Sequence, residues 1–349
     1  MAEDDRWLLS AWAQALAAQA ADLHLSSGQM PLMRCRGQLV PLSTDTPCPA
    51  WPWPGLAAYF SDAHAQRLLQ GQTAGEAEGA FEHPTLGRAR WSLARSDHGL
   101  MLVMRLIRGQ IPSLWEVQLD ATLANRLLPA QGLVLITGAT GSGKSSTLAA
   151  LVAHRQQTQG GHVITLEDPI EFRYGDGLGQ RQSREQEQDQ SQHQGRISQR
   201  EIGRDSPSFA SALRAVLRQD PDVLLIGELR DAETARLALS AAETGHLVLS
   251  TLHTASAVGA IDRLLSLFPP DEQTLAQAQL AETLVGVLAQ ELIWQDGQAR
   301  ALREVLIATS AVRHLIREHR LAQIHSVMQT GSSLGMQTRA QAWERGGFS

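Results

Sequence analysis

The chain has 349 residues, of which 43% are hydrophobic, so it can build sizeable cores and is expected to form about two domains. Its formal net charge of -6 argues against a generally basic surface, so no nucleic acid partner is expected. Its two cysteines, Cys35 and Cys48, exclude a four-thiolate zinc site and a disulfide framework, which is typical of a reducing compartment.

The beginning of the chain is acidic, where a secretory signal would be basic. No uninterrupted apolar stretch approaches the ~20 residues that are needed to span a bilayer. We therefore expect a cytoplasmic protein, or one that is peripheral to the inner face of the cytoplasmic membrane.

Residues 1–108 are predicted to form a small α+β domain. This range holds a helix-like stretch and several short segments of alternating polarity, at Asp5–Ala21, Leu23–Leu25, Leu32–Met33 and Arg88–Leu93. Turn-forming and polar residues follow, which predicts a linker over 109–121.

Residues 122–270 are predicted to form an α/β core. Four apolar runs of the β type alternate there with helical stretches: Leu133–Thr137, His162–Leu166, Val223–Ile226 and His246–Thr251. Runs of this kind, joined by helical crossovers, predict a parallel sheet with helices on both faces.

Residues 271–349 are predicted to be helical throughout. Apolar residues recur at helical spacing in Leu275–Leu292 and again in Ala311–Leu321. We therefore expect a C-terminal helical subdomain appended to the sheet.

The range 180–195 interrupts the core and is dominated by glutamine. A segment so poor in apolar residues cannot bury enough surface to offset the entropy of ordering it, so we expect a mobile loop. Its composition favours an inert surface insertion.

A phosphate-binding loop is predicted directly after the first apolar run of the core. The pattern is formed by Gly138, Ala139, Thr140, Gly141, Ser142, Gly143, Lys144 and Ser145, and a helical stretch begins at Ser146. Glycines let the backbone turn tightly, so that its N–H groups surround phosphates at a helix N-terminus. We expect Lys144 to reach the β- and γ-phosphates and Ser145 to bind Mg²⁺.

Three polar side chains follow other strands of the predicted sheet. Glu228 comes just after Val223–Ile226, and is our candidate for a ligand of Mg²⁺ or of the attacking water. Glu167 follows a second strand and is placed to orient or deprotonate water, and His253 follows a third and is placed to sense the γ-phosphate. Which glutamate is the base stays open at this point.

These motifs, in this order, resemble the secretion ATPase superfamily of the GspE/PulE type. The marks of that superfamily are a Walker A loop, an acidic Asp box, a Walker B box and a His box, and they match residues 138–145, 165–173, 223–231 and 244–254. The resemblance implies a RecA-like P-loop NTPase core, ATP as the substrate and Mg²⁺ as the cofactor.

The resemblance is strongest to the PilT-like retraction ATPases of type IV pili, and it covers almost the whole chain. The residues that carry it outside the core are 22–28 with Pro31, Arg34 and Gly37, and further on 311–318, 328–331 and 335–338. It implies an N-terminal PAS-like domain and a homohexameric ring that acts on an inner-membrane platform protein, with related pilus ATPases as further partners.

In such a ring, ATP would lie between the PAS-like and RecA-like domains, with arginines contributed across those interfaces. Arg88, Arg90 and Arg105 match positions at which the family has arginines. The chain departs from the family at His98, Val312 and His314, and in the glutamine-rich insertion, which bears on coupling to the pilus more than on hydrolysis.

Three alternatives remain. Pilus assembly and type II secretion ATPases resemble this chain in the core, but they generally carry a tetracysteine zinc motif that two cysteines cannot build. A second alternative is a slow nucleotide-binding regulator of another pilus motor. The third is a DNA motor, which the net charge disfavours.

Overall fold

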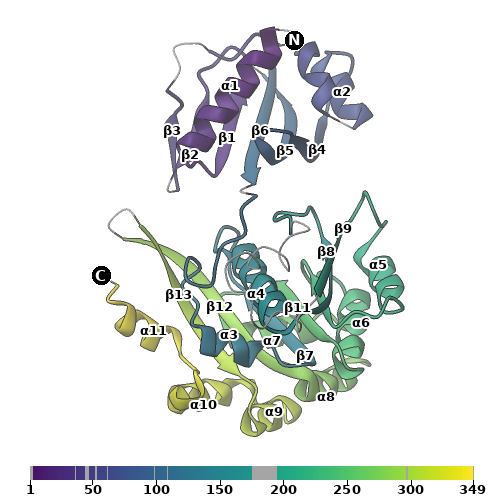
Figure 1. Cartoon of the computed structure of the whole chain (residues 1–349), viewed down its shortest axis with the longest axis vertical. Helices are drawn as coiled ribbons and strands as arrows, with labels where there is room; N and C mark the ends of the chain where they lie inside the picture. The colour runs from purple at the N-terminus through teal and green to yellow at the C-terminus, as the bar shows by residue number, and fades with distance from the viewer. Residues whose placement is uncertain are drawn as a thin grey trace, which may run out of the picture. The chain divides into compact units, whose positions relative to one another are not determined.

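The computed structural model describes residues 3–35, 37–43, 47–51, 53–60, 62–97, 99–107, 109–174, 195–295 and 298–348. The chain divides into two compact units, Met1–Gln110 and Ile111–Ser349 (Figure 1). Most of the glutamine-rich stretch lies outside the described residues, as does His98. In the parts of the chain that the structure covers, no helix is long and apolar enough to cross a membrane.

The first unit is built on an antiparallel sheet in the order β3-β2-β1-β6-β5-β4. Its elements are α1 (Glu3–Ala17), β1 (Asp22–Ser26), β2 (Leu32–Cys35), β3 (Gln38–Pro41), η1 (Pro54–Tyr59), α2 (Ala63–Leu69), β4 (Glu76–His83), β5 (Gly87–Ser96) and β6 (Gly99–Ile107). The helix and the short strands expected in this range are therefore confirmed, although the helix ends at Ala17.

One face of this sheet is apolar and packs on the helices. Leu8 and Trp12 of α1 and Leu68 of α2 are fully buried against side chains such as Leu23 and Leu102. Because side chains alternate along a strand, the polar residues between these apolar ones lie on the opposite face.

The second unit contains a seven-stranded sheet in the order β13-β12-β7-β11-β10-β8-β9. Six of its strands are parallel, and β13 is antiparallel at one edge. The strands are β7 (Gly132–Thr137), β8 (Gly161–Glu167), β9 (Gly195–Glu201), β10 (Val223–Ile226), β11 (Leu247–Leu252), β12 (Leu284–Gln295) and β13 (Gln298–Ile307). All four expected strands of the core are confirmed.

Helices cover both faces of this sheet (Figure 1). Along β7, Val134 and Ile136 pack on the side of α3 and α4, while Leu133 and Leu135 pack on the side of α5 to α10. This alternation buries the strand on both faces, as is typical of parallel sheets. The helices are α3 (Ala121–Leu127), α4 (Lys144–Gln159), α5 (Phe209–Val216), α6 (Ala232–Glu243), α7 (Ala257–Leu265), α8 (Gln273–Thr283), α9 (Ser310–Arg317), η2 (Leu321–Gln323), α10 (Ile324–Thr330), η3 (Ser332–Leu334) and α11 (Arg339–Gly346).

The prediction that 271–349 is helical throughout was wrong over 284–295 and 298–307. The helix α8 ends at Thr283, and β12 and β13 then extend the central sheet beside β7. The residues of β12 from Leu284 to Ala289 are largely buried and apolar on both faces, so their periodicity does not distinguish a helix from a strand. The core therefore extends past its expected end at residue 270, and the helices after Ser310 are separated from α8 by a hairpin.

The expected linker, 109–121, mostly belongs to the second unit. Arg303 of β13 is buried and donates to the carbonyl oxygens of Gln118, at 2.6 Å, and Val117. The Gln118 side chain in turn donates to Ala299 O at 3.0 Å and accepts from Ala301 N at 2.9 Å. These bonds fix residues 117–118 to the edge strand.

Candidate active site

The phosphate loop connects β7 to α4, as its sequence pattern predicts. Gly138, Gly141 and Gly143 have φ angles of +147°, +81° and +86°, which side chains with a Cβ rarely adopt. A Cβ at position 138 would lie 2.2 Å from Gln290 O, so the loop also requires glycine there for close approach. Ala139, Thr140 and Ser145 are exposed, Ser142 is buried, and Ser146 is half-buried in the first turn of α4.

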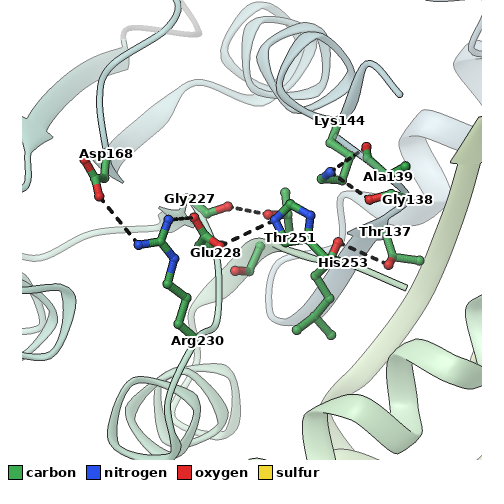
Figure 2. A network of polar contacts seen from close by, with 12 residues as sticks. Thr137, Gly138, Ala139, Lys144, Asp168, Gly227, Glu228, Arg230, Thr251 and His253 are labelled. Carbon is green, nitrogen blue, oxygen red and sulfur yellow. Dashed lines mark hydrogen bonds and ion pairs between the residues drawn. The ribbon is translucent and has the colours of Figure 1, made fainter. Parts of the chain in front are cut away.

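Lys144 begins α4 and turns back over the loop (Figure 2). Its ammonium donates to Gly138 O at 2.8 Å and to Ala139 O at 3.0 Å. Burial lowers the pKa of Lys144, while the carboxylates of Glu228 and Glu171 act in the opposite direction. The loop therefore holds its one ammonium beside its own backbone, close to two acids.

The strand that leads into the loop is tied to the strand that leads to His253. Thr137 Oγ1 donates to Leu252 O at 3.2 Å and accepts from Thr254 N at 2.8 Å. In the same way, Thr251 Oγ1 donates to Gly227 O at 2.6 Å, which joins β11 to the end of β10. The carboxyl ends of the three strands therefore form one connected edge.

Glu228 lies at this edge between two basic side chains (Figure 2). Its Oε1 accepts from Arg230 Nη2 at 2.5 Å, and its Oε2 lies 3.5 Å from His253 Nε2. Arg230 Nη1 is also 3.8 Å from Asp168 Oδ2. Partial burial raises the pKa of Glu228, but Arg230 and His253 outweigh it, so the pKa is lowered and the carboxylate is held ionised.

Glu167 ends β8 and has a different environment. Its Oε1 accepts from Thr165 Oγ1 at 2.6 Å and from Gln199 Nε2 at 3.2 Å. Burial raises the pKa of Glu167 above its ordinary value despite these two bonds. The two acids of the site thus have pKa values displaced in opposite directions, an arrangement that is typical of acid–base sites.

Arg88, Arg90 and Arg105 all lie in the first unit, on the polar face of its sheet. In the strand register, Arg90 of β5 lies opposite Arg105 of β6, and Arg105 lies opposite Asp22 of β1. The buried carboxylate of Asp22 accepts from Arg105 Nε at 2.9 Å and lies 3.6 Å from Arg34 Nε. The three arginines thus share a face with one another and are not within the unit that holds the loop.

The protein oxygens at this site can bind a magnesium ion only if phosphate oxygens supply the rest of its coordination shell. Among the described residues, no group of three or more His, Cys, Asp and Glu side chains could hold a metal. Ser145 presents an exposed hydroxyl after Lys144, and Glu228 presents an ionised carboxylate. One or two protein oxygens together with substrate phosphates are the usual ligands of Mg²⁺ in nucleotide sites.

Three side chains of this site were missed by the sequence prediction. Gln199 contacts Glu167, Arg230 contacts Glu228, and Gln290 contacts the phosphate loop. Arg230 lies two residues after Glu228, so its proximity was available from the local sequence. The two glutamines come from distant strands, and no local pattern marks them.

Comparison with known proteins identifies the family of this chain. The family model described as "Type II/IV secretion system protein" matches residues 92–343. The type IV pilus retraction ATPase PilT of Pseudomonas aeruginosa is 39% identical over 91% of this chain and 88% of its own length. The uncharacterized protein YggR of Escherichia coli is 42% identical over 93% of each chain. A crystal structure of the pilus retraction motor PilT with bound ADP has a TM-score of 0.78 at 34% identity, over 95% of this chain and 90% of that one.

The matches to PilT and YggR cover more than nine-tenths of this chain, and the range 92–343 of the family model contains the loop, Glu167, Glu228 and His253. The shared fold is an α/β unit with a mixed sheet, preceded by an antiparallel sheet. The chain therefore belongs to the type II/IV secretion system protein family and is an ATPase of the type IV pilus and secretion group.

Proposed function

We propose that this chain is a subunit of a homohexameric motor in which Mg²⁺-dependent ATP hydrolysis drives type IV pilus retraction. The observation that carries the proposal is the meeting of Lys144, Glu228 and His253 at one edge of the parallel sheet. Similarity over nearly the full length to a relative named as a retraction ATPase supports retraction as the direction of the proposed motor. A RecA-like core and a PAS-like N-terminal unit are part of the same proposal.

In this proposal the triphosphate lies on residues 138–146. The backbone amides of the loop and the start of α4 surround the phosphates, and Lys144 exchanges its two carbonyl partners for phosphate oxygens. Positive charge at that position stabilises the negative charge that develops on the transferred group. Arg88, Arg90 and Arg105 are proposed to supply further cations to nucleotide from the first unit.

The opposite pKa displacements of the two acids assign their roles. Burial raises the pKa of Glu167, which makes its carboxylate the stronger proton acceptor of the two acids, and we assign it as the base that accepts a proton from the attacking water. Glu228 has a lowered pKa and stays ionised, which suits a ligand of Mg²⁺ or of its water. His253, at 3.5 Å from Glu228, is assigned as the sensor of the γ-phosphate.

Ser145 and Glu228 would hold Mg²⁺, which supplies charge neutralisation for the β- and γ-phosphates. The chain's own contribution is to fix the carboxylate. Arg230 holds one oxygen of Glu228, and the bond from Thr251 to Gly227 fixes the preceding backbone. Loss of the γ-phosphate would then remove a contact from both His253 and Lys144.

The proposed partners are other copies of this chain and an inner-membrane platform protein, with related pilus ATPases as further partners. The proposed location is the cytoplasmic face of that membrane. Nucleotide state is proposed to change the angle between the two units of each subunit, because a cleft that closes on a γ-phosphate relaxes when the phosphate leaves.

Three experiments test this function. A deletion strain that loses retraction but keeps extended pili supports the retraction motor, whereas loss of pilus extension or of secretion would assign the chain to the assembly or secretion branch. Purified protein with no turnover of Mg-ATP above that of a Lys144→Ala variant would instead favour a nucleotide-binding regulator. Tight, salt-sensitive retention of DNA on a filter would revive a DNA motor.

A further inference from the structure

Gln290 lies on β12, beneath the phosphate loop, and uses both ends of its side-chain amide. Its Nε2 donates to Ser142 O at 2.7 Å, and its Oε1 accepts from Thr147 Oγ1 at 3.0 Å. Gln290 and Thr147 are both buried, with exposed fractions of 5% and 1%. The amide therefore bridges the loop and the first turns of α4 in a place from which water is excluded.

The backbone around Gln290 also packs closely on the loop. A Cβ at position 138 would lie 2.2 Å from Gln290 O, and a Cβ at position 143 would lie 3.3 Å from Gln290 Nε2 and 3.7 Å from Leu292. Two of the three loop glycines thus face this short section of β12. The strand forms a floor against which the loop is pressed.

The bond to Ser142 O has a directional consequence for the next amide. A peptide bond is planar, and in its trans form the C=O and N–H groups point in opposite directions. Because Gln290 holds the carbonyl of Ser142 toward β12, the N–H of Gly143 is turned away from β12. Gly143 is also the residue that caps the start of α4, where backbone amides are unsatisfied within the helix.

The carbonyl of Ser142 fixes which end of the Gln290 amide faces the loop, because a carbonyl oxygen can only accept a hydrogen bond. The NH₂ group of Gln290 must therefore face Ser142 O, and the Thr147 hydroxyl donates to the Oε1 that remains. The N–H of Thr147 meanwhile donates to Gly143 O at 3.0 Å, which is the first α-helical hydrogen bond after the loop. Loop, helix start and strand are therefore joined through one amide.

We propose that Gln290 is a positioning residue of the phosphate loop: it holds the Ser142–Gly143 peptide in the orientation that presents the Gly143 N–H to the polyphosphate of a nucleotide. It acts through the loop and does not contact the nucleotide. The inference rests on the proposed binding of nucleotide at residues 138–146. Replacing Gln290 should weaken nucleotide binding and raise KM by a larger factor than it lowers kcat.

The test compares Gln290→Met with Val287→Ala. Methionine has a similar length but cannot make either hydrogen bond, whereas Val287 is fully buried on the same strand and has no contact with the loop among the described hydrogen bonds. Titration with a fluorescent ADP in Mg²⁺ should show binding weakened by about ten-fold or more for Gln290→Met, the loss typical of a buried polar group left unpaired. Val287→Ala should lower the Tm and leave the affinity close to that of the unchanged protein.

A double-mutant cycle separates orientation from bulk stability. Thr147→Val removes the hydroxyl that donates to Gln290 Oε1 and steadies the amide, so it should weaken ADP binding by itself. The double variant with Gln290→Met should bind ADP little worse than whichever single variant binds it more weakly. Additive losses of ADP-binding free energy in the two single variants would show that Gln290 and Thr147 do not act through one network, and would contradict the inference.

The remaining outcomes distinguish this inference from the proposed function. If the unchanged protein binds ADP and Lys144→Ala does not, but Gln290→Met binds as tightly as the unchanged protein, the positioning role is wrong and the loop assignment stands. If Gln290→Met and Val287→Ala have the same Tm and lose the same amount of ADP affinity, the inference is also contradicted. If the unchanged protein binds no ADP at all, the proposed function itself fails.

Discussion

The side-chain amide of Gln199 donates to Glu167 at 3.2 Å, so the edge strand β9 helps to orient the proposed base. The same NH₂ group donates to Phe172 O at 2.8 Å, and the Gln199 carbonyl accepts from Tyr174 N at 3.0 Å. All of these contacts are made by one residue of a strand that was not expected. The orientation of Glu167 is therefore coupled to the segment that follows it.

Replacing Gln199 should slow hydrolysis and move its pH dependence. The bond from Gln199 lowers the pKa of Glu167, so its removal in Gln199→Leu should raise that pKa further. The acid limb of the kcat profile should then shift to higher pH, and kcat at neutral pH should fall by about ten-fold, less than the full value of a general base.

The matched control is Ser198→Ala, the neighbouring position on β9. Ser198 Oγ lies 3.2 Å from His162 Nε2 and makes no described bond to Glu167. Its profile should keep the midpoint of the unchanged protein. Equal midpoints in Gln199→Leu and the unchanged protein would show that Gln199 does not act on the base.

Replacing Glu167 itself should abolish most of the turnover while leaving nucleotide binding intact. Glu167→Gln keeps the shape and a hydrogen-bonding oxygen but cannot accept a proton, so kcat should fall by about 10²–10⁴-fold. The unchanged enzyme should lose activity as the pH falls through a midpoint above the ordinary glutamate value of 4.5, because protonation removes the base. Steady-state kinetics between about pH 5 and 9 measures both effects.

The outcome for Glu228 provides the contrast. Its pKa is lowered, so it should remain ionised through the acid limb that Glu167 produces. If Glu228→Gln, and not Glu167→Gln, removes the acid limb while preserving ADP affinity, the two roles are reversed.

Two glycines of the loop should respond differently to the same substitution. Both Gly138 and Gly141 have positive φ, so alanine is strained at either position, by roughly 1–3 kcal/mol. At Gly138 the added Cβ also meets Gln290 O at 2.2 Å and Ser142 Oγ at 2.5 Å, whereas at Gly141 it meets no atom within 4 Å. Gly138→Ala should therefore lose more stability in urea unfolding. Equal free energies of unfolding for the two variants would contradict the close approach of β12.

The two cysteines of the first unit should differ in reactivity. Cys48 is buried, and burial raises the pKa of its thiol to about 11, while Cys35 is half-buried. Only the thiolate reacts quickly with a thiol reagent. In the native protein at pH 8, a value well below that raised pKa, Cys35 should be modified much faster than Cys48. Mass spectrometry of labelled peptides measures the two rates. The rates should become similar only after denaturation, and equal rates in the native protein would contradict the burial of Cys48.

The sequence predicts the loop and its neighbouring acids because their chemistry is local. Gly138, Lys144 and Ser145 lie within one contiguous motif, and Glu228 comes two residues after a short apolar run. The strands that carry them are continuous apolar runs of the length of a buried parallel strand. Local residues were therefore enough to predict this edge of the sheet.

The floor of the loop was not predictable in the same way. Gln290 lies 148 residues from Ser142, in a run whose apolar residues fill both faces and are compatible with a helix. Gln199 is 32 residues from Glu167 and follows the glutamine-rich stretch. Only the pairing of β12 with β7, and of β9 with β8, brings these two amides to the site.

The most direct test of the central claim is the rate of Mg-ATP hydrolysis by the purified chain, measured beside Lys144→Ala. We expect phosphate release by the unchanged protein and almost none by the variant, with both proteins folded by circular dichroism. Equal and near-zero rates, in preparations that are equally folded and assembled, would contradict the assignment of this chain as an ATP-driven motor.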